Sequence, residues 1–140
     1  MKRAAVMMVV AIGLSLPVPG PAQADMLPTL RTHMAQLGTL MNRLFREIDE
    51  PDMASDLIGV TQEMEALLLR AAEFPPPKMR DDPDPERRAT GIRGFRACLA
   101  KARRALTELR QALAAETSSV PKDRLLYLDQ VRRDCHSSFA

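Results

Sequence analysis

The sequence of 140 residues lacks tryptophan, contains one tyrosine and four phenylalanines, and has a formal net charge of only +2. So few aromatic rings cannot provide a stacking platform for nucleobases, and so balanced a charge does not provide a basic surface that follows phosphates. Lys2 and Arg3, at the start of the chain, account for the excess positive charge. We therefore expect no nucleic-acid partner.

Long apolar runs are scarce, and the only extended one lies at the start of the chain. Lys2 and Arg3 are followed by an uncharged apolar run from Ala4 to about Leu16, and Ala22-Gln23-Ala24 gives the small-x-small pattern of a cleavage site. The run is short for a membrane span, so the pattern predicts a secretory signal peptide over residues 1–24 rather than an uncleaved anchor. The mature chain, 25–140, is then expected in the periplasm, without a membrane partner.

Proline is present but does not interrupt the periodic segments of the mature chain. Between the prolines, apolar residues recur at alternating spacings of three and four, which places them on one stripe of a helix, and the strand period of two is absent. The spacing predicts helices over about 28–49, 52–73, 87–115 and 120–138. Short loops near residues 50 and 117 favour an all-α, antiparallel up-down-up-down four-helix bundle. The proline-rich link after the second helix is expected to be an extended strap.

There are only two cysteines, Cys98 and Cys135. In an antiparallel pair of helices that turns near residue 117, these two positions lie at nearly equal height. Because an exported protein folds where disulfides persist, the register predicts a Cys98–Cys135 disulfide, with two unpaired buried thiols as the alternative.

There are also only two histidines, and one of them is expected near a methionine. The start of the first helix should lie beside the end of the fourth, which brings Met34 and His136 to one layer, with Phe95 near the same level. A methionine and a histidine form a known axial pair for haem iron, although a core methionine and a histidine at a helix C-terminus explain the same residues. His33 is expected to be solvated, and the methionines form no Met-x-Met cluster of the copper-binding kind.

The sequence contains few side chains arranged as hydrolytic enzymes require. The bundle would have one inward histidine, no serine on a glycine-flanked turn and no cluster of carboxylates. We therefore expect that the protein is not an enzyme.

Several segments, in order along the chain, carry a resemblance to a known family. They are "MAQLGTLMNRL" from Met34, "PPK" at 76–78, "GF" at 94–95 and "RRDCH" followed by "SSF" at the end. The mature chain resembles the cytochrome b-562 family, exported four-helix bundles that bind haem b without covalent attachment. The tail is also similar to that of cytochrome c-prime, but Arg132 stands where the first cysteine of the CxxCH attachment motif belongs.

The resemblance implies that Met34 and His136 are the axial ligands of a haem, that Phe95 packs against it, and that the protein transfers electrons to an unidentified redox partner. The polar outer faces of the helices favour a monomer. Arg132 excludes attachment through two thioethers. Two alternatives remain open: a single thioether from Cys135 to a haem vinyl group, or a haem-free bundle locked by the disulfide that acts as a binding or stress protein.

Overall fold

The computed structural model describes residues 29–115 and 119–139. These residues form no strand and five helices, and the prediction of an all-α protein is confirmed for them. The helices are α2 (Leu30–Glu47), α3 (Ala54–Ala71), α4 (Pro77–Arg80), α5 (Pro85–Ala114) and α6 (Val120–Phe139). The expected signal peptide, 1–24, lies outside the described residues.

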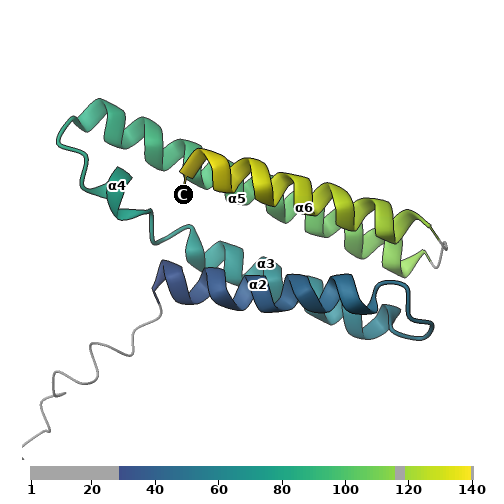
Figure 1. Ribbon diagram of the computed structural model, residues 1–140. Helices are drawn as coiled ribbons and strands as arrows, with labels where there is room; N and C mark the ends of the chain where they lie inside the picture. Colours follow the sequence, from purple (N-terminus) through teal and green to yellow (C-terminus); the bar gives the residue numbers. More distant parts are fainter. Residues whose placement is uncertain (1–28, 116–118, 140) are drawn as a thin grey trace, which may run out of the picture.

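The four long helices lie in two layers (Figure 1). One layer contains α2 and α3, and the other contains α5 and α6. Close packing joins α2 to α3, α3 to α5 and α5 to α6, so that α3 and α5 each have two long neighbours. The two layers are therefore joined mainly through the packing of α3 on α5.

Two of the long helices, α2 and α5, begin after residues whose side chains accept hydrogen bonds from free backbone amides. The hydroxyl of Thr29 accepts from the amide of Thr32 at 3.3 Å, at the start of α2. The carboxylate of Asp84 accepts from the amides of Glu86 and Arg87 at 2.9 and 3.2 Å, at the start of α5. Pro85 follows as the first residue of that helix, where its missing amide hydrogen costs nothing.

The link between α3 and α5 is not the extended strap that its prolines predicted. It contains the short helix α4, which begins directly after Pro76 because the fixed φ of Pro77 suits a first helical position. Met79 of α4 is buried against α5, where a Cβ added to Gly91 would lie 3.1 Å from its Cγ. The absence of a side chain at Gly91 thus lets α4 pack on α5.

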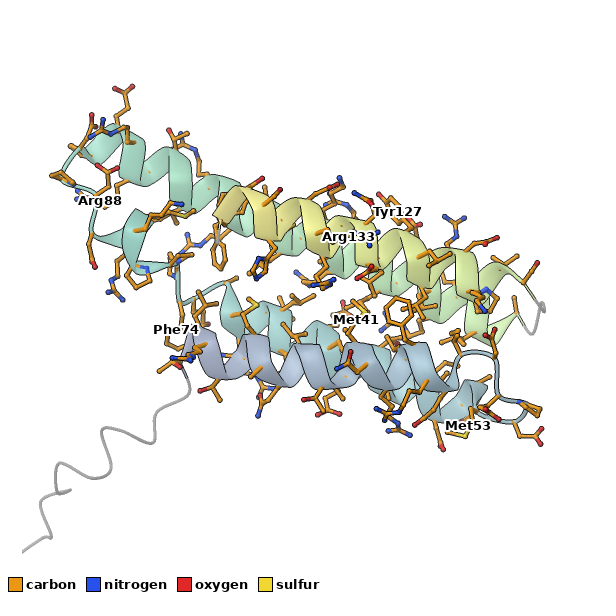
Figure 2. The ribbon with its side chains drawn as sticks, viewed as in Figure 1. Met41, Met53, Phe74, Arg88, Tyr127 and Arg133 are labelled. Atoms are coloured by element: carbon orange, nitrogen blue, oxygen red, sulfur yellow. A yellow bond between two sulfur atoms is a disulfide. The ribbon has the colours of Figure 1, made fainter. Side chains whose placement is uncertain are left out.

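The core between the layers consists mainly of leucine. Its most deeply buried members come from all four long helices: Leu44, Leu57, Leu106, Leu109 and Leu125. Figure 2 shows Met41 between the two layers, whereas Met53 and Arg88 lie at opposite ends of the molecule. Within residues 29–115 and 119–139, no helix combines the length and the apolar composition that a bilayer crossing requires.

Candidate functional site

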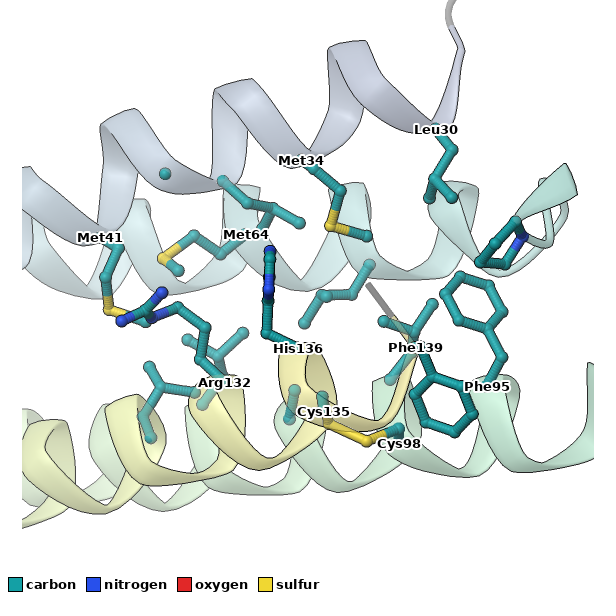
Figure 3. Close-up of a pocket in the computed structure, with 18 residues that line it drawn as sticks. Leu30, Met34, Met41, Met64, Phe95, Cys98, Arg132, Cys135, His136 and Phe139 are labelled. Atoms are coloured by element: carbon teal, nitrogen blue, oxygen red, sulfur yellow. A yellow bond between two sulfur atoms is a disulfide. The ribbon is translucent and has the colours of Figure 1, made fainter. Parts of the chain in front are cut away.

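A cavity of about 380 Å³ lies between the layers, toward the end where α2 begins and α6 ends. All four long helices contribute to its walls, together with Pro76 before α4 (Figure 3). Most of the lining side chains are apolar, and none is a carboxylate. The volume lies within the range of sites that bind organic ligands and cofactors.

Met34 and His136 line this cavity from opposite walls. Met34 projects from α2, and His136 projects from the last turn of α6 toward it (Figure 3). Met34 is 37% exposed, and His136 is also exposed, so both residues are reachable from solvent at this side of the bundle. The two residues that the sequence singled out as a ligand pair are therefore brought to one cavity.

Phe95 closes the cavity on the side of α5. It is buried, and its ring makes an edge-to-face contact with that of Phe139, with 6.1 Å between the centroids. Phe139 also lines the cavity, and a Cβ added to Gly94 would lie only 3.3 Å from the tip of its ring. The absence of a side chain at Gly94 allows the end of α6 to pack closely on α5.

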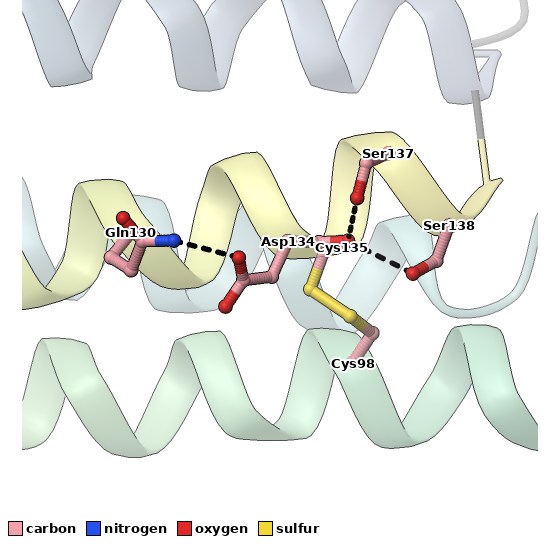
Figure 4. Close-up of a disulfide and its surroundings, with 6 residues drawn as sticks. All are labelled: Cys98, Gln130, Asp134, Cys135, Ser137 and Ser138. Atoms are coloured by element: carbon pink, nitrogen blue, oxygen red, sulfur yellow. Dashed lines mark hydrogen bonds between the residues drawn. A yellow bond between two sulfur atoms is a disulfide. The ribbon is translucent and has the colours of Figure 1, made fainter.

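Cys98 and Cys135 form a disulfide at the cavity wall, as the helix register predicted (Figure 4). Their Cα atoms are 5.8 Å apart, and the bond joins α5 to the last turns of α6. In the same turns, the hydroxyls of Ser137 and Ser138 both donate to the carbonyl oxygen of Asp134, at 2.9 and 3.0 Å. The disulfide holds the segment that carries His136 against α5.

Of the described residues that line the cavity, Arg132 alone carries a permanent charge. Its Nε donates to Asp129 at 2.8 Å, and Arg133 pairs with the other oxygen of the same carboxylate at 3.0 Å. Asp129 is nearly buried, and so the charge of Arg132 is held beside a counter-ion at the edge of an apolar space.

His33 is not solvated, and that expectation was wrong. Only 3% of the residue is exposed, and its ring stacks on Phe74, with 5.6 Å between the centroids. The apolar pattern of α2 did not indicate that His33 is buried, because the residue that covers it, Phe74, comes from the turn after α3. The Nδ1 atom of His33 is buried without a hydrogen-bond partner, and His33 does not line the cavity.

Met64 and Met41 also line the cavity, although their place in the sequence did not mark them as site residues. Both residues follow the three-four apolar spacing of the predicted helices. That spacing does not distinguish a side chain in the packed core from one beside a cavity. In the part of the chain that the structure describes, no three His, Cys, Asp or Glu residues are grouped as for a metal ion.

Comparisons with protein-family models, with curated proteins and with solved structures found no match. The resemblance to the cytochrome b-562 family therefore rests on the sequence segments quoted above.

Proposed function

We propose that this protein is a haem-binding electron-transfer protein of the cytochrome b-562 type, with Met34 and His136 as the axial ligands. The observation that carries the proposal is that these two side chains line one apolar cavity from opposite walls. Thioether sulfur and imidazole nitrogen are a donor set suited to haem iron. The residues present thus fit the group.

The fold that belongs to this proposal is an antiparallel, up-down-up-down four-helix bundle. The sequential packing of α2 on α3, α3 on α5 and α5 on α6 supports it. In such a bundle the first and last helices are neighbours, so a ligand from each can approach the same iron.

Each lining residue has a role under this proposal. When bound, haem supplies reversible one-electron chemistry at its iron. Met34 and His136 would hold the iron, and methionine–histidine ligation would give it a relatively high potential. Phe95 packs on the cofactor, and the apolar walls limit water around it. The exposure of Met34 and His136 places the ligands on an open side, where electrons can enter or leave.

The haem in this proposal is b-type. In the disulfide, the sulfur of Cys135 is already bonded to that of Cys98, so it is not free to form a thioether with a vinyl group. Arg132 stands where the other attachment cysteine would be needed. We further propose that the mature protein is a periplasmic monomer without enzymatic activity, and that it serves a redox partner yet to be identified.

The two proposed ligands are tested by visible spectra of variants at each position. Met34→Leu removes the sulfur and should change the low-spin spectrum of the haem complex, whereas Met53→Leu, remote from the cavity, should not. His136→Ala should weaken haem binding strongly. The proposal fails if the spectrum of Met34→Leu is that of the wild type.

A haem-free bundle that acts as a binding or stress protein is the second candidate. The observation in its favour is the Cys98–Cys135 disulfide, because this bond ties α5 to α6 at the cavity and needs no cofactor to do so. Intact mass after alkylation, with and without reductant, tests the disulfide, and the haem content of the same sample separates the two candidates. Free alkylation of both cysteines without reductant would eliminate this second candidate.

A further inference from the structure

The cavity brings together most of the methionines in the described part of the chain. Of the five methionines in the described residues, three line it: Met34, Met41 and Met64. They come from α2 and α3, which form the wall opposite α6, and the other two, Met53 and Met79, do not reach it. The spacing of these residues along the sequence does not show the grouping, because the faces of α2 and α3 that carry them come together only in the folded protein.

An imidazole projects toward the wall that carries two of these methionines. In Figure 3, His136 projects from α6 toward the wall from which Met34 and Met64 project. Met64 is 2% exposed and lies deep in the cavity, whereas Met34 and His136 lie at its open side. Methionine has three rotatable side-chain bonds and adapts to irregular spaces, so the two thioethers can turn toward a common point near the imidazole.

The chemistry of these donors selects a particular class of ion. Thioethers are soft and uncharged, they favour copper(I), and imidazole is compatible with it. Among residues 29–115 and 119–139, no carboxylate lines the cavity, so hard divalent cations such as Mg²⁺ and Ca²⁺ lack the oxygen ligands that they require there. The two cysteine sulfurs at the cavity, those of Cys98 and Cys135, are joined to each other and supply no thiolate.

We propose that the haem-free protein binds a soft monovalent cation, of the copper(I) and silver(I) class, through Met34, Met64 and His136. The proposal does not depend on haem binding, although it uses Met34 and His136 in common with it. Met64 distinguishes the two ligands, because it completes the cation site and is not an axial ligand of the haem.

The positive charge of Arg132 opposes a cation in this cavity. Asp129 reduces the opposition, since its carboxylate accepts a hydrogen bond from Arg132 at 2.8 Å. The ion is therefore held by bonds to its ligand atoms and not by electrostatic attraction to the cavity walls. Replacing Arg132 with glutamine should strengthen cation binding, whereas a site for an anionic ligand would respond in the opposite direction.

The test is a titration of the haem-free protein with silver nitrate in chloride-free buffer at pH 7.5. Silver(I) is the probe because it stays in one oxidation state. With the methionine methyl groups labelled with ¹³C, the NMR signals of Met34 and Met64 should shift together and saturate at one equivalent, while those of Met53 and Met79 remain in place. Met64→Leu should weaken silver binding about tenfold or more, an effect of at least about 1.4 kcal/mol, and Met79→Leu should not.

Two results would overturn the proposal: equal shifts of all the methionine signals, or unchanged signals of Met34 and Met64. A thermal melt of Met64→Leu verifies that the variant is folded, and silver binding by Met34→Leu provides an independent check if it is not. Normal haem spectra without silver binding overturn this inference alone. Silver binding by a protein that takes up no haem overturns the proposed function alone.

Discussion

The imidazole of His33 stacks on the ring of Phe74, with the centroids 5.6 Å apart and an angle of 26° between the ring planes. This contact joins the first turn of α2 to the turn that follows α3. Met34, the next residue in α2, lines the cavity. The stack therefore fixes the segment from which one wall of the site projects.

The stack should contribute measurably to stability. His33→Ala is expected to lower the free energy of unfolding by about 2 kcal/mol, since it removes a buried ring. His33→Phe keeps the ring and eliminates the buried Nδ1 that has no partner, so it should be at least as stable as the wild type. Urea unfolding followed by circular dichroism measures both. The exposed His136 is the control, and equal losses for His33→Ala and His136→Ala would contradict the argument.

The disulfide should stabilise the fold mainly through the unfolded chain. Its cysteines are 37 residues apart, for which loop closure corresponds to at most about 4 kcal/mol. The double variant Cys98→Ala/Cys135→Ala should lose up to this amount in urea unfolding, and the wild type should lose a similar amount on reduction. An unfolding midpoint that reductant leaves unchanged would show that the bond contributes nothing.

Two helical glycines, one in open space and one beside an aromatic ring, allow a direct test of how closely α6 packs on α5. A Cβ at Gly59 would meet nothing within 4 Å, so Gly59→Ala should raise the free energy of unfolding by up to about 1 kcal/mol through helix propensity alone. A Cβ at Gly94 would lie 3.3 Å from the ring of Phe139, so the same substitution there should gain less or destabilise. Thermal melts of both variants compare them directly. Equal stabilisation would mean that Phe139 does not pack closely on α5.

Glu65 of α3 joins the two layers through two arginines of α5. It contacts Arg110 at 2.9 Å and Arg103 at 3.7 Å, and all three side chains are at least partly buried. Glu65→Ala should cost about 1–2 kcal/mol, because both guanidinium groups lose a charged partner. Glu108→Ala, which breaks a more exposed pair with Arg124, should cost about 0–1 kcal/mol. Denaturant unfolding measures both losses, and similar values would contradict an interlayer role for Glu65.

Features that depend on a single helix, or on the register of one helix pair, could be predicted from the sequence. The three-four spacing of apolar residues predicted the four long helices. The observed ends of these helices differ from the predicted ends by two residues or fewer. The equal height of Cys98 and Cys135 around a turn near residue 117 gave the disulfide.

Features that depend on how several elements meet could not be predicted. The sequence did not indicate that Phe74 would cover His33, since no periodic pattern extends through the turn after α3. Consecutive prolines suggested an extended link, but Pro77 instead begins the short helix α4. The grouping of Met34 with Met64 requires the lateral packing of α2 on α3, which stripe positions alone do not specify.

The most direct test of the central claim is the haem content of the protein after aerobic expression with haem available. The absorption spectrum should show a Soret band, with one haem per chain in a pyridine haemochrome assay, and acid–acetone should extract that haem into the solvent. The absence of a Soret band, or haem that stays with the protein after extraction, would contradict non-covalent binding between Met34 and His136.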